Sequence, residues 1–351
     1  MIVVAATPAA AQSFARVGAE SVISLDVFGG DNVSHKPQLI IDVPVGLRLG
    51  QNWQLFVRPW LRLPRPNQPG AVTPDWETEI YGAGVRYERS GVVGIRVEAG
   101  QIVSPVGLGL ADALPSVNPT ILRHLTYAVP MPAFDRTVPR ATPIAAAYPL
   151  GAAATVSTDR WDARAALVNS APTRNWVLSR PVKPEQTPVI EAGAGVTPMT
   201  GLRFGASFAH GLYATASEST IPAPDGRSMT MVGSEAEYAF GYTRITGEII
   251  RTVFETSTQT AVAYEWFVQG MQILSPRWFA AARLEGASAP PLRTATTVGA
   301  RPDFQITEAT AGFRVNREIT LRGSYVVRQA YNAATWDQQV GFSVVWARRW
   351  W

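Results

Sequence analysis

The sequence is built from segments of about ten residues in which apolar and polar side chains alternate. From residue 39 to residue 49, every odd position is Leu, Ile or Val, whereas the even positions include Asp42 and Arg48. Residues 92–101 repeat the pattern. Because successive side chains of a β-strand point to opposite faces, each such segment predicts a strand with one apolar and one polar face.

The alternation repeats often enough to predict about sixteen strands. The segments that carry it are residues 15–28, 38–49, 52–63, 75–88, 92–103, 142–157, 160–170, 187–197, 201–212, 229–240, 242–255, 260–274, 277–288, 304–315, 318–328 and 337–350. The connections between them are alternately tight and long, except that 256–259 in the long set is short. Two rims that differ in this way are typical of transmembrane β-barrels. We therefore predict an all-β fold in which residues 12–351 form one closed antiparallel transmembrane β-barrel.

Composition excludes most other classes of protein. Hydrophobic residues make up 46% of the 351 residues, which excludes intrinsic disorder. No uncharged apolar stretch reaches about 18 residues, so a helical membrane protein is excluded. Cysteine is absent, which excludes disulfides and thiolate chemistry. A net charge of only +4 argues against a nucleic-acid partner. A soluble sandwich or propeller stays as an alternative, although its loops need not alternate in length.

The N-terminal residues resemble the end of a secretory signal. Residues 1–11 are apolar and end in three alanines, Ala9 to Ala11, the small-residue pattern that precedes a cleavage site. We interpret residues 1–11 as the remnant of a signal peptide that is cleaved after Ala11. An unstructured terminus is the alternative.

Aromatic residues near strand ends predict two belts at the membrane interfaces. The aromatic side chains on the presumed lipid-facing parity are Tyr81, Tyr87, Trp161, Tyr238, Trp266, Trp278, Tyr325 and Trp346. Each alone is equally compatible with an ordinary strand aromatic, since aromatic residues favour strands generally.

The polar face of the predicted strands carries many charged residues. One section of it is rich in arginine, with Arg58, Arg62, Arg86 and Arg96 and with Glu98 as its main acid. Burying an unpaired ion costs several kcal/mol, whereas a lumen formed by about sixteen strands is wide enough to hold water. We therefore predict a water-filled channel with a positively charged wall section that attracts anions.

The longest connection spans residues 104–141 and needs a functional reason in a compact barrel. We predict that this third long loop folds into the lumen, with an external lid as the alternative. Glycines on the lumen parity of the two preceding strands would leave room for it; they are Gly82, Gly84, Gly94 and Gly100. Charged residues of the loop would narrow the pore and set its ion preference; they are Asp112, Arg123, Asp135, Arg136 and Arg140.

The segment from Ala99 to Leu108 resembles the G-x-x-x-x-P-x-G segment of the phosphate-selective porin family. More broadly, the strand count, the loop alternation, the Ala-rich leader and the aromatic C-terminus resemble sixteen-stranded bacterial outer-membrane porins over nearly the whole chain. This resemblance implies a passive channel in the bacterial outer membrane, often assembled as a homotrimer, with an inward-folded third loop.

We therefore expect an outer-membrane porin that passes small anionic or neutral hydrophilic solutes by diffusion, with a modest preference for anions. Phe56 and Trp60 share the parity of the wall arginines, so a substrate-specific channel for sugars or aromatic acids is one alternative. A non-conducting structural or adhesive barrel is another. The three histidines lack zinc-site spacing and no nucleophile motif is present, so we expect no enzyme activity, cofactor or metal.

Overall fold

The computed structural model describes residues 15–32, 37–63, 77–109, 114–138, 140–145, 147–174, 188–219, 226–257, 259–292 and 298–350. The expected signal remnant, residues 1–11, lies outside them. Among the described residues, no helix is long and apolar enough to cross a bilayer.

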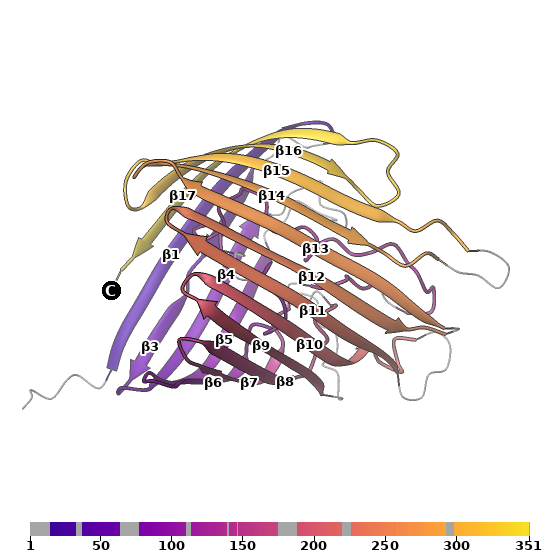
Figure 1. Cartoon of the computed structure of the whole chain (residues 1–351), viewed down its shortest axis with the longest axis horizontal. Coiled ribbons are helices and arrows are strands. Elements are labelled where there is room, and N and C mark those ends of the chain that lie inside the picture. The colour runs from indigo at the N-terminus through magenta and orange to yellow at the C-terminus, as the bar shows by residue number, and fades with distance from the viewer. Residues whose placement is uncertain are drawn as a thin grey trace, which may run out of the picture.

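The described strands form one antiparallel sheet that closes on itself, because β1 pairs with β17 (Figure 1). The strands are β1 (Ala15–Gly30), β2 (Gln38–Asp42), β3 (Val45–Leu49), β4 (Trp53–Leu63), β5 (Glu77–Arg89), β6 (Gly94–Gln101), β7 (Leu150–Ser157), β8 (Trp161–Val168), β9 (Val189–Met199), β10 (Leu202–Ala214), β11 (Arg227–Phe240), β12 (Thr243–Glu255), β13 (Thr260–Ile273), β14 (Trp278–Ser288), β15 (Asp303–Arg314), β16 (Ile319–Gln329) and β17 (Asp337–Arg349). The prediction of a closed antiparallel barrel is confirmed.

Two short strands share one position in the barrel, so the sheet has the predicted sixteen positions. Both β2 and β3 pair with β1 on one side and with β4 on the other. The predicted strand 38–49 is interrupted at Pro44, which has no N–H to donate. The ladder continues around the break, since Val43 N donates to Pro59 O and Glu20 N donates to Pro44 O, each at 3.1 Å.

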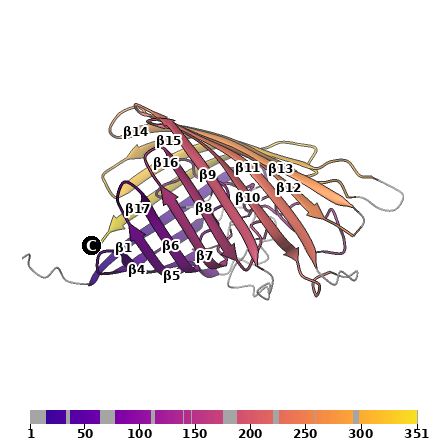
Figure 2. The same ribbon diagram turned by 60° about the horizontal axis from the view of Figure 1, so that its bottom comes forward.

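Burial alternates along the strands as the sequence pattern predicts. On β13, Tyr264 and Trp266 are exposed, whereas Glu265 and Phe267, which alternate with them, are buried. The exposed face carries most of the large apolar side chains, which is the arrangement that lipid requires. We call the opposite face the buried face of the barrel wall. Figure 2 shows the same strands from below, with tight turns at the rim that carries the C-terminus.

The connection between β6 and β7, residues 102–149, is longer than predicted and is called the long connection here. The prediction of a strand from residue 142 is wrong for residues 142–145 and 147–149. Thr142 N donates to Thr173 O (2.9 Å) and Ala145 N donates to Pro172 O (2.6 Å), so residues 142–145 pair with the connection after β8. The strand β7 begins at Leu150, after Ala147 O and Pro149 O have accepted hydrogen bonds from Ser104 N (3.2 Å) and Ile102 N (2.9 Å).

The long connection packs its apolar side chains on the buried face in two clusters. One cluster joins it to β8–β13, and its larger members are Ile102, Val106, Met131, Phe134, Val168, Met229, Met231, Ile250 and Phe254. The second joins it to β1 and β14–β16, and its larger members are Phe28, Ile121, Leu122, Leu125, Phe304, Ile306 and Val326. The buried face is therefore apolar over much of β8–β16. The sequence pattern had predicted a polar interior face on every strand.

Glycines of β5 and β6 permit close pairing of these two strands rather than an approach of the long connection. Gly84 lies opposite Gly100, and an added Cβ at Gly84 would lie 2.1 Å from Ala99 O. Gly100 has a φ of +127°, and its added Cβ would lie 2.2 Å from Ala83 O. The reason predicted for these two glycines is therefore wrong, because the space beside them is filled by the neighbouring strand.

Replacing Gly100 tests this close pairing. Gly100→Ala forces both an unfavourable backbone conformation and a clash with Ala83, so we expect a loss of roughly 1–3 kcal/mol in the free energy of unfolding. Urea unfolding of the refolded barrel, followed by tryptophan fluorescence, measures it. Gly270→Ala is the control, because an added Cβ there meets nothing within 4 Å. Equal midpoints for the two variants would contradict the assignment.

Candidate functional site

Carboxylates of the barrel wall hold the backbone of the long connection. Glu308 on β15 accepts hydrogen bonds from the amides of Ile121 (2.8 Å) and Leu122 (3.1 Å). Glu285 on β14 accepts one from the amide of Leu125 (3.1 Å). Both glutamates are fully buried, and charge-assisted bonds from amides are stronger than neutral ones, so they offset part of the cost of burial.

Two further wall side chains hold the connection on either side of these glutamates. Glu248 on β12 accepts hydrogen bonds from the amide of Leu108 and from the hydroxyl of Tyr127. Arg322 on β16 donates to the carbonyl oxygens of Asn118 (2.8 Å) and Thr120 (2.7 Å). The connection is thus held by β12–β16, and its other side faces β1, β2, β4 and β5.

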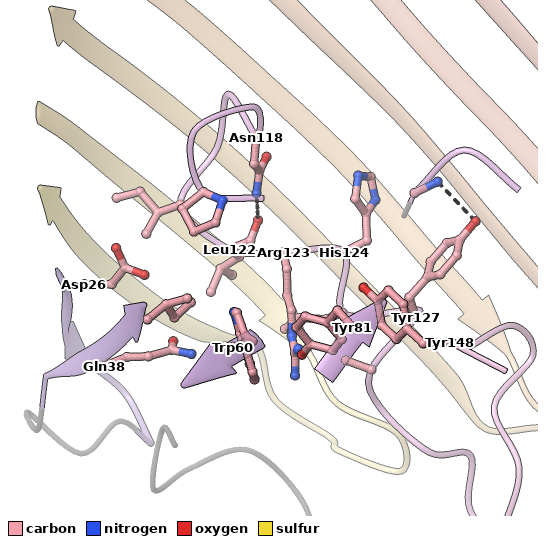
Figure 3. A pocket seen from close by; sticks show the side chains of 16 residues that line it. Asp26, Gln38, Trp60, Tyr81, Asn118, Leu122, Arg123, His124, Tyr127 and Tyr148 are labelled. Carbon is pink, nitrogen blue, oxygen red and sulfur yellow. Dashed lines mark hydrogen bonds between the residues drawn. The ribbon is translucent and has the colours of Figure 1, made fainter. Parts of the chain in front are cut away.

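A pocket of about 60 Å³ lies between the long connection and that opposite wall (Figure 3). The side chains that matter for its chemistry are Asp26, Gln38, Trp60, Tyr81, Arg123, His124, Tyr127 and Tyr148. It combines one guanidinium with several aromatic rings, and it is the place where the connection comes nearest to the arginine-rich wall section.

Three aromatic rings line the pocket in a row of tilted contacts, which we call the ring stack. The ring centroids of Trp60 and Tyr81 are 4.6 Å apart, and those of Tyr81 and Tyr148 are 4.2 Å apart. Arg62 lies over the Trp60 ring at 4.7 Å and Arg58 over the Tyr81 ring at 5.6 Å. Such cation–π contacts stabilise the observed arrangement of the rings and the guanidinium groups.

Tyr81 reaches this stack because β5 contains a β-bulge. The register between β4 and β5 shifts between Val57 and Pro59, so that β5 has one residue more than β4 at this point. The extra residue reverses the parity of the side chains that precede it. Alternation predicted Tyr81 on the lipid-facing side; that prediction is wrong, and the bulge is the reason.

Each of the four predicted wall arginines lies beside a carboxylate. The pairs are Arg58 with Asp42 (2.7 Å), Arg62 with Glu79 (4.0 Å), Arg86 with Glu98, and Arg96 with Glu88 (3.3 Å). The sequence analysis missed Glu79 and Glu88 as partners. The β5–β6 hairpin register contained the signal for Glu88, since it places Arg86 opposite Glu98 and Glu88 opposite Arg96. The paired charges largely cancel across this wall section.

Arg123 differs from the wall arginines. Its side chain extends from the long connection toward Tyr81 (Figure 3). Its Nε is buried without a hydrogen-bond partner, and no carboxylate of the described chain forms an ion pair with its guanidinium. Burial lowers the pKa of Arg123, and the nearby positive charge of Arg62 lowers it further. The nearby Glu79 carboxylate opposes this effect in part, but no ion pair joins it to Arg123 among the described residues, so an anion in the pocket would meet a positive charge that is compensated only in part.

The other residues predicted for a constriction do not gather around Arg123. Asp112 lies outside the described residues. Arg136 and Arg140 are exposed, and Asp135 is buried beside Arg136 in a separate pocket of about 380 Å³ that the β12–β13 turn also lines. Of the five predicted residues, Arg123 is therefore the one that the structure places in the pocket facing the arginine-rich wall.

Asp135 fixes the long connection to the β12–β13 turn. It accepts hydrogen bonds from the amide of Thr137 (2.8 Å) and from the amide of Ser257 (2.9 Å). Burial alone would raise the pKa of Asp135, but these hydrogen bonds outweigh it and hold the pKa below its usual range. The carboxylate therefore stabilises this attachment in its charged form.

Comparison of the sequence finds no matching protein family and no similar protein among those with curated descriptions. Comparison of the structure finds several barrels of the same fold. The loop L8 deletion mutant of OmpT from Vibrio cholerae aligns with a TM-score of 0.59 at 10% identity, over 96% of this chain and 100% of that chain. OmpF of Salmonella typhi in complex with daunomycin aligns with a TM-score of 0.61 at 10% identity, over 95% of this chain and 97% of that chain. OpdK of Pseudomonas aeruginosa with vanillate aligns with 0.51 at 9%, over 95% and 99%.

At these identities the likeness is one of fold. The chain therefore has the fold of bacterial outer-membrane porins, and its apolar exposed face is the one that a barrel presents to lipid.

Glu308→Ala tests whether wall carboxylates hold the long connection. The change leaves two amides without their acceptor and Arg283 without its nearest carboxylate (3.1 Å), so we expect a loss of about 2–3 kcal/mol in unfolding free energy. We also expect a larger and noisier single-channel conductance. Glu318→Ala is the control, because the Glu318 carboxylate contacts Arg348 and Trp346 at the barrel rim and holds no part of the long connection. A Glu308 variant with the conductance of the wild type would refute the assignment.

The Asp135 attachment predicts a pH dependence. Because its pKa is depressed in the folded chain, its contribution to stability is present above the unfolded pKa of about 3.9 and is lost as the pH falls through the folded value. Asp135→Asn should therefore destabilise the barrel by about 1 kcal/mol at pH 7 and by much less near pH 2.5. Urea midpoints across this range measure the difference. A difference that does not change with pH would argue against the attachment.

Proposed function

We propose that this chain is an outer-membrane porin that passes small hydrophilic solutes by diffusion with a modest preference for anions. The observation that carries the proposal is the unpaired guanidinium of Arg123 in the pocket between the long connection and the β4–β5 wall. A charged group that narrows a water-filled barrel selects ions by their sign.

The path along the barrel is inferred from the side on which the long connection packs. Its contacts with β8–β16 support a position inside the lumen, where it fills the half of the barrel that those strands line. The other half, along β2–β6, is the part left for solutes. A pocket of about 530 Å³ there is lined by Arg48, Arg58, Arg86 and Arg349 near the short-turn rim, and we call it the vestibule.

The preference for anions follows from the balance of charges along that path. Arg58, Arg62, Arg86 and Arg96 each lie beside an acid, so their contribution is smaller than their number suggests. Arg123 adds a positive charge that forms no ion pair with a carboxylate of the described residues. A low-dielectric wall strengthens its field, so that even one such charge biases the ions that enter.

The oligomeric state and the class of solute are inferred from similar proteins and from composition. One of the structurally similar barrels, OmpT of Vibrio cholerae, is described in a trimer form, and a homotrimer in outer-membrane lipid is our proposal for this chain. The likeness of residues 99–108 to the phosphate-selective porins makes phosphate one anion to compare with chloride. The chain has only Lys36 and Lys183 as lysines, which favours a general anion preference over phosphate specificity.

Arg123→Gln tests the proposal in a planar bilayer under a salt gradient. The wild type should give a reversal potential on the anion-selective side, and the variant should move it toward or past zero, because the positive charge of Arg123 is lost. Arg348→Gln is a matched control, since Arg348 is exposed, paired with Glu318 and outside the arginine-rich wall section. A reversal potential that is the same in all three proteins would overturn the anion preference, and absence of any conductance would favour a structural or adhesive barrel.

A further inference from the structure

We propose that Arg123 and the rings of Trp60, Tyr81 and Tyr148 form a binding subsite for a planar aromatic monocarboxylate. This inference rests on the proposed channel function and names the solute class that the narrow region takes. The subsite lies where the long connection faces the bulge of β5 (Figure 3).

The guanidinium of Arg123 supplies the part that recognises an anion. A guanidinium presents its N–H groups in a planar fork that matches the two oxygens of a carboxylate. In the described chain the buried Nε has no acceptor and the side chain has no acidic partner. A bound carboxylate would supply the missing acceptor and would also screen Arg123 from Arg62, whose positive charge opposes it.

The three rings supply the part that recognises a planar apolar body. Trp60 and Tyr148 are 6% and 3% exposed, so their faces lie away from bulk water and are available to a solute only within the pocket. Aromatic pairs prefer offset or edge contacts at centroid separations of about 4.5–7 Å, and the Trp60–Tyr81 and Tyr81–Tyr148 pairs already show how a fourth ring would pack. Phosphate, a tetrahedral anion without an apolar face, would make no favourable packing contact with these rings.

Tyr81 separates the pocket from the vestibule, since it lines both of them. The pocket of about 60 Å³ is too small for an aromatic ring, because an apolar cavity that holds benzene measures about 150 Å³. Binding therefore requires the Tyr81 ring to turn away. This movement breaks the contact of Arg58 with the Tyr81 ring, and contacts with the bound solute have to offset that loss. The solute would take the place of the Tyr81 ring between Trp60 and Tyr148, and an aromatic solute is the kind that best replaces the contacts of that ring.

Conductance block by benzoate tests the subsite. In a planar bilayer with the full chain, benzoate should reduce chloride conductance saturably, and acetate and benzamide should need at least tenfold higher concentrations. Acetate carries the charge without the ring, and benzamide carries the ring without the charge. If acetate blocked the conductance at the same concentration as benzoate, the aromatic part of the proposal would be overturned. If benzamide did so, the ionic part would be overturned.

Variants of Arg123 separate a binding role from a general charge. Arg123→Lys keeps the positive charge but loses the planar fork, so it should keep the anion-selective reversal potential and weaken benzoate block at least fivefold. Arg123→Gln should abolish the block, and Tyr148→Leu should weaken it without changing the reversal potential. Arg348→Gln, at an exposed pair with Glu318, should leave both unchanged. Benzoate block of wild-type strength in Arg123→Gln would refute the subsite.

Binding without transport distinguishes failure of the subsite from failure of the channel. Benzoate should quench tryptophan fluorescence of the refolded barrel, and the quenching should be lost in Trp60→Phe. Saturable quenching in a barrel that does not conduct would overturn the channel and keep the subsite. Conductance with no quenching and no block would overturn the subsite and keep the channel.

Discussion

The constraint on which the structure depends is that a backbone in lipid must satisfy its own hydrogen bonds. Only closure of the sheet removes its edges, and the pairing of β1 with β17 provides it. Closure then gives every strand one face toward lipid and one toward the interior, so alternation follows along each strand. The breaks in regular pairing at Pro44 and beside Pro59 are confined to neighbouring positions of β2–β5, and the candidate site lies at the same place.

A second relation links the buried carboxylates to the function. Glu248, Glu285 and Glu308 are expensive to bury, and they are stabilised by N–H and O–H groups of the long connection. This holds the connection to one half of the barrel. The opposite half keeps its charged wall, and the side of the connection that carries Arg123 faces it. In the channel that we propose, the connection would leave one narrow region in which a single charge has a large influence.

Much of the candidate site was predictable as a set of residue types but not as a set of neighbours. Arg58, Arg62 and Arg86 were assigned to the polar face from parity, and the structure places all three beside buried or partly buried acids. Their compensation by Asp42 and Glu79 depends on the register between strands, which alternation along one strand does not contain. In the sequence, Arg123 and Asp135 are both charged residues of the same loop, and nothing there distinguishes their roles. Only packing shows that the first enters the pocket while the second fixes the β12–β13 turn.

The sequence by itself determined the strand positions, the two faces and the unequal rims, because alternation with a period of two is a property of each segment and is independent of its neighbours. The tertiary structure decided where that rule fails. The bulge in β5 turned Tyr81 from lipid to the interior, and contacts with the connection after β8 kept residues 142–145 out of the sheet. Both depend on hydrogen bonds between segments far apart in the chain or in neighbouring strands. Such partners are fixed only when the barrel closes.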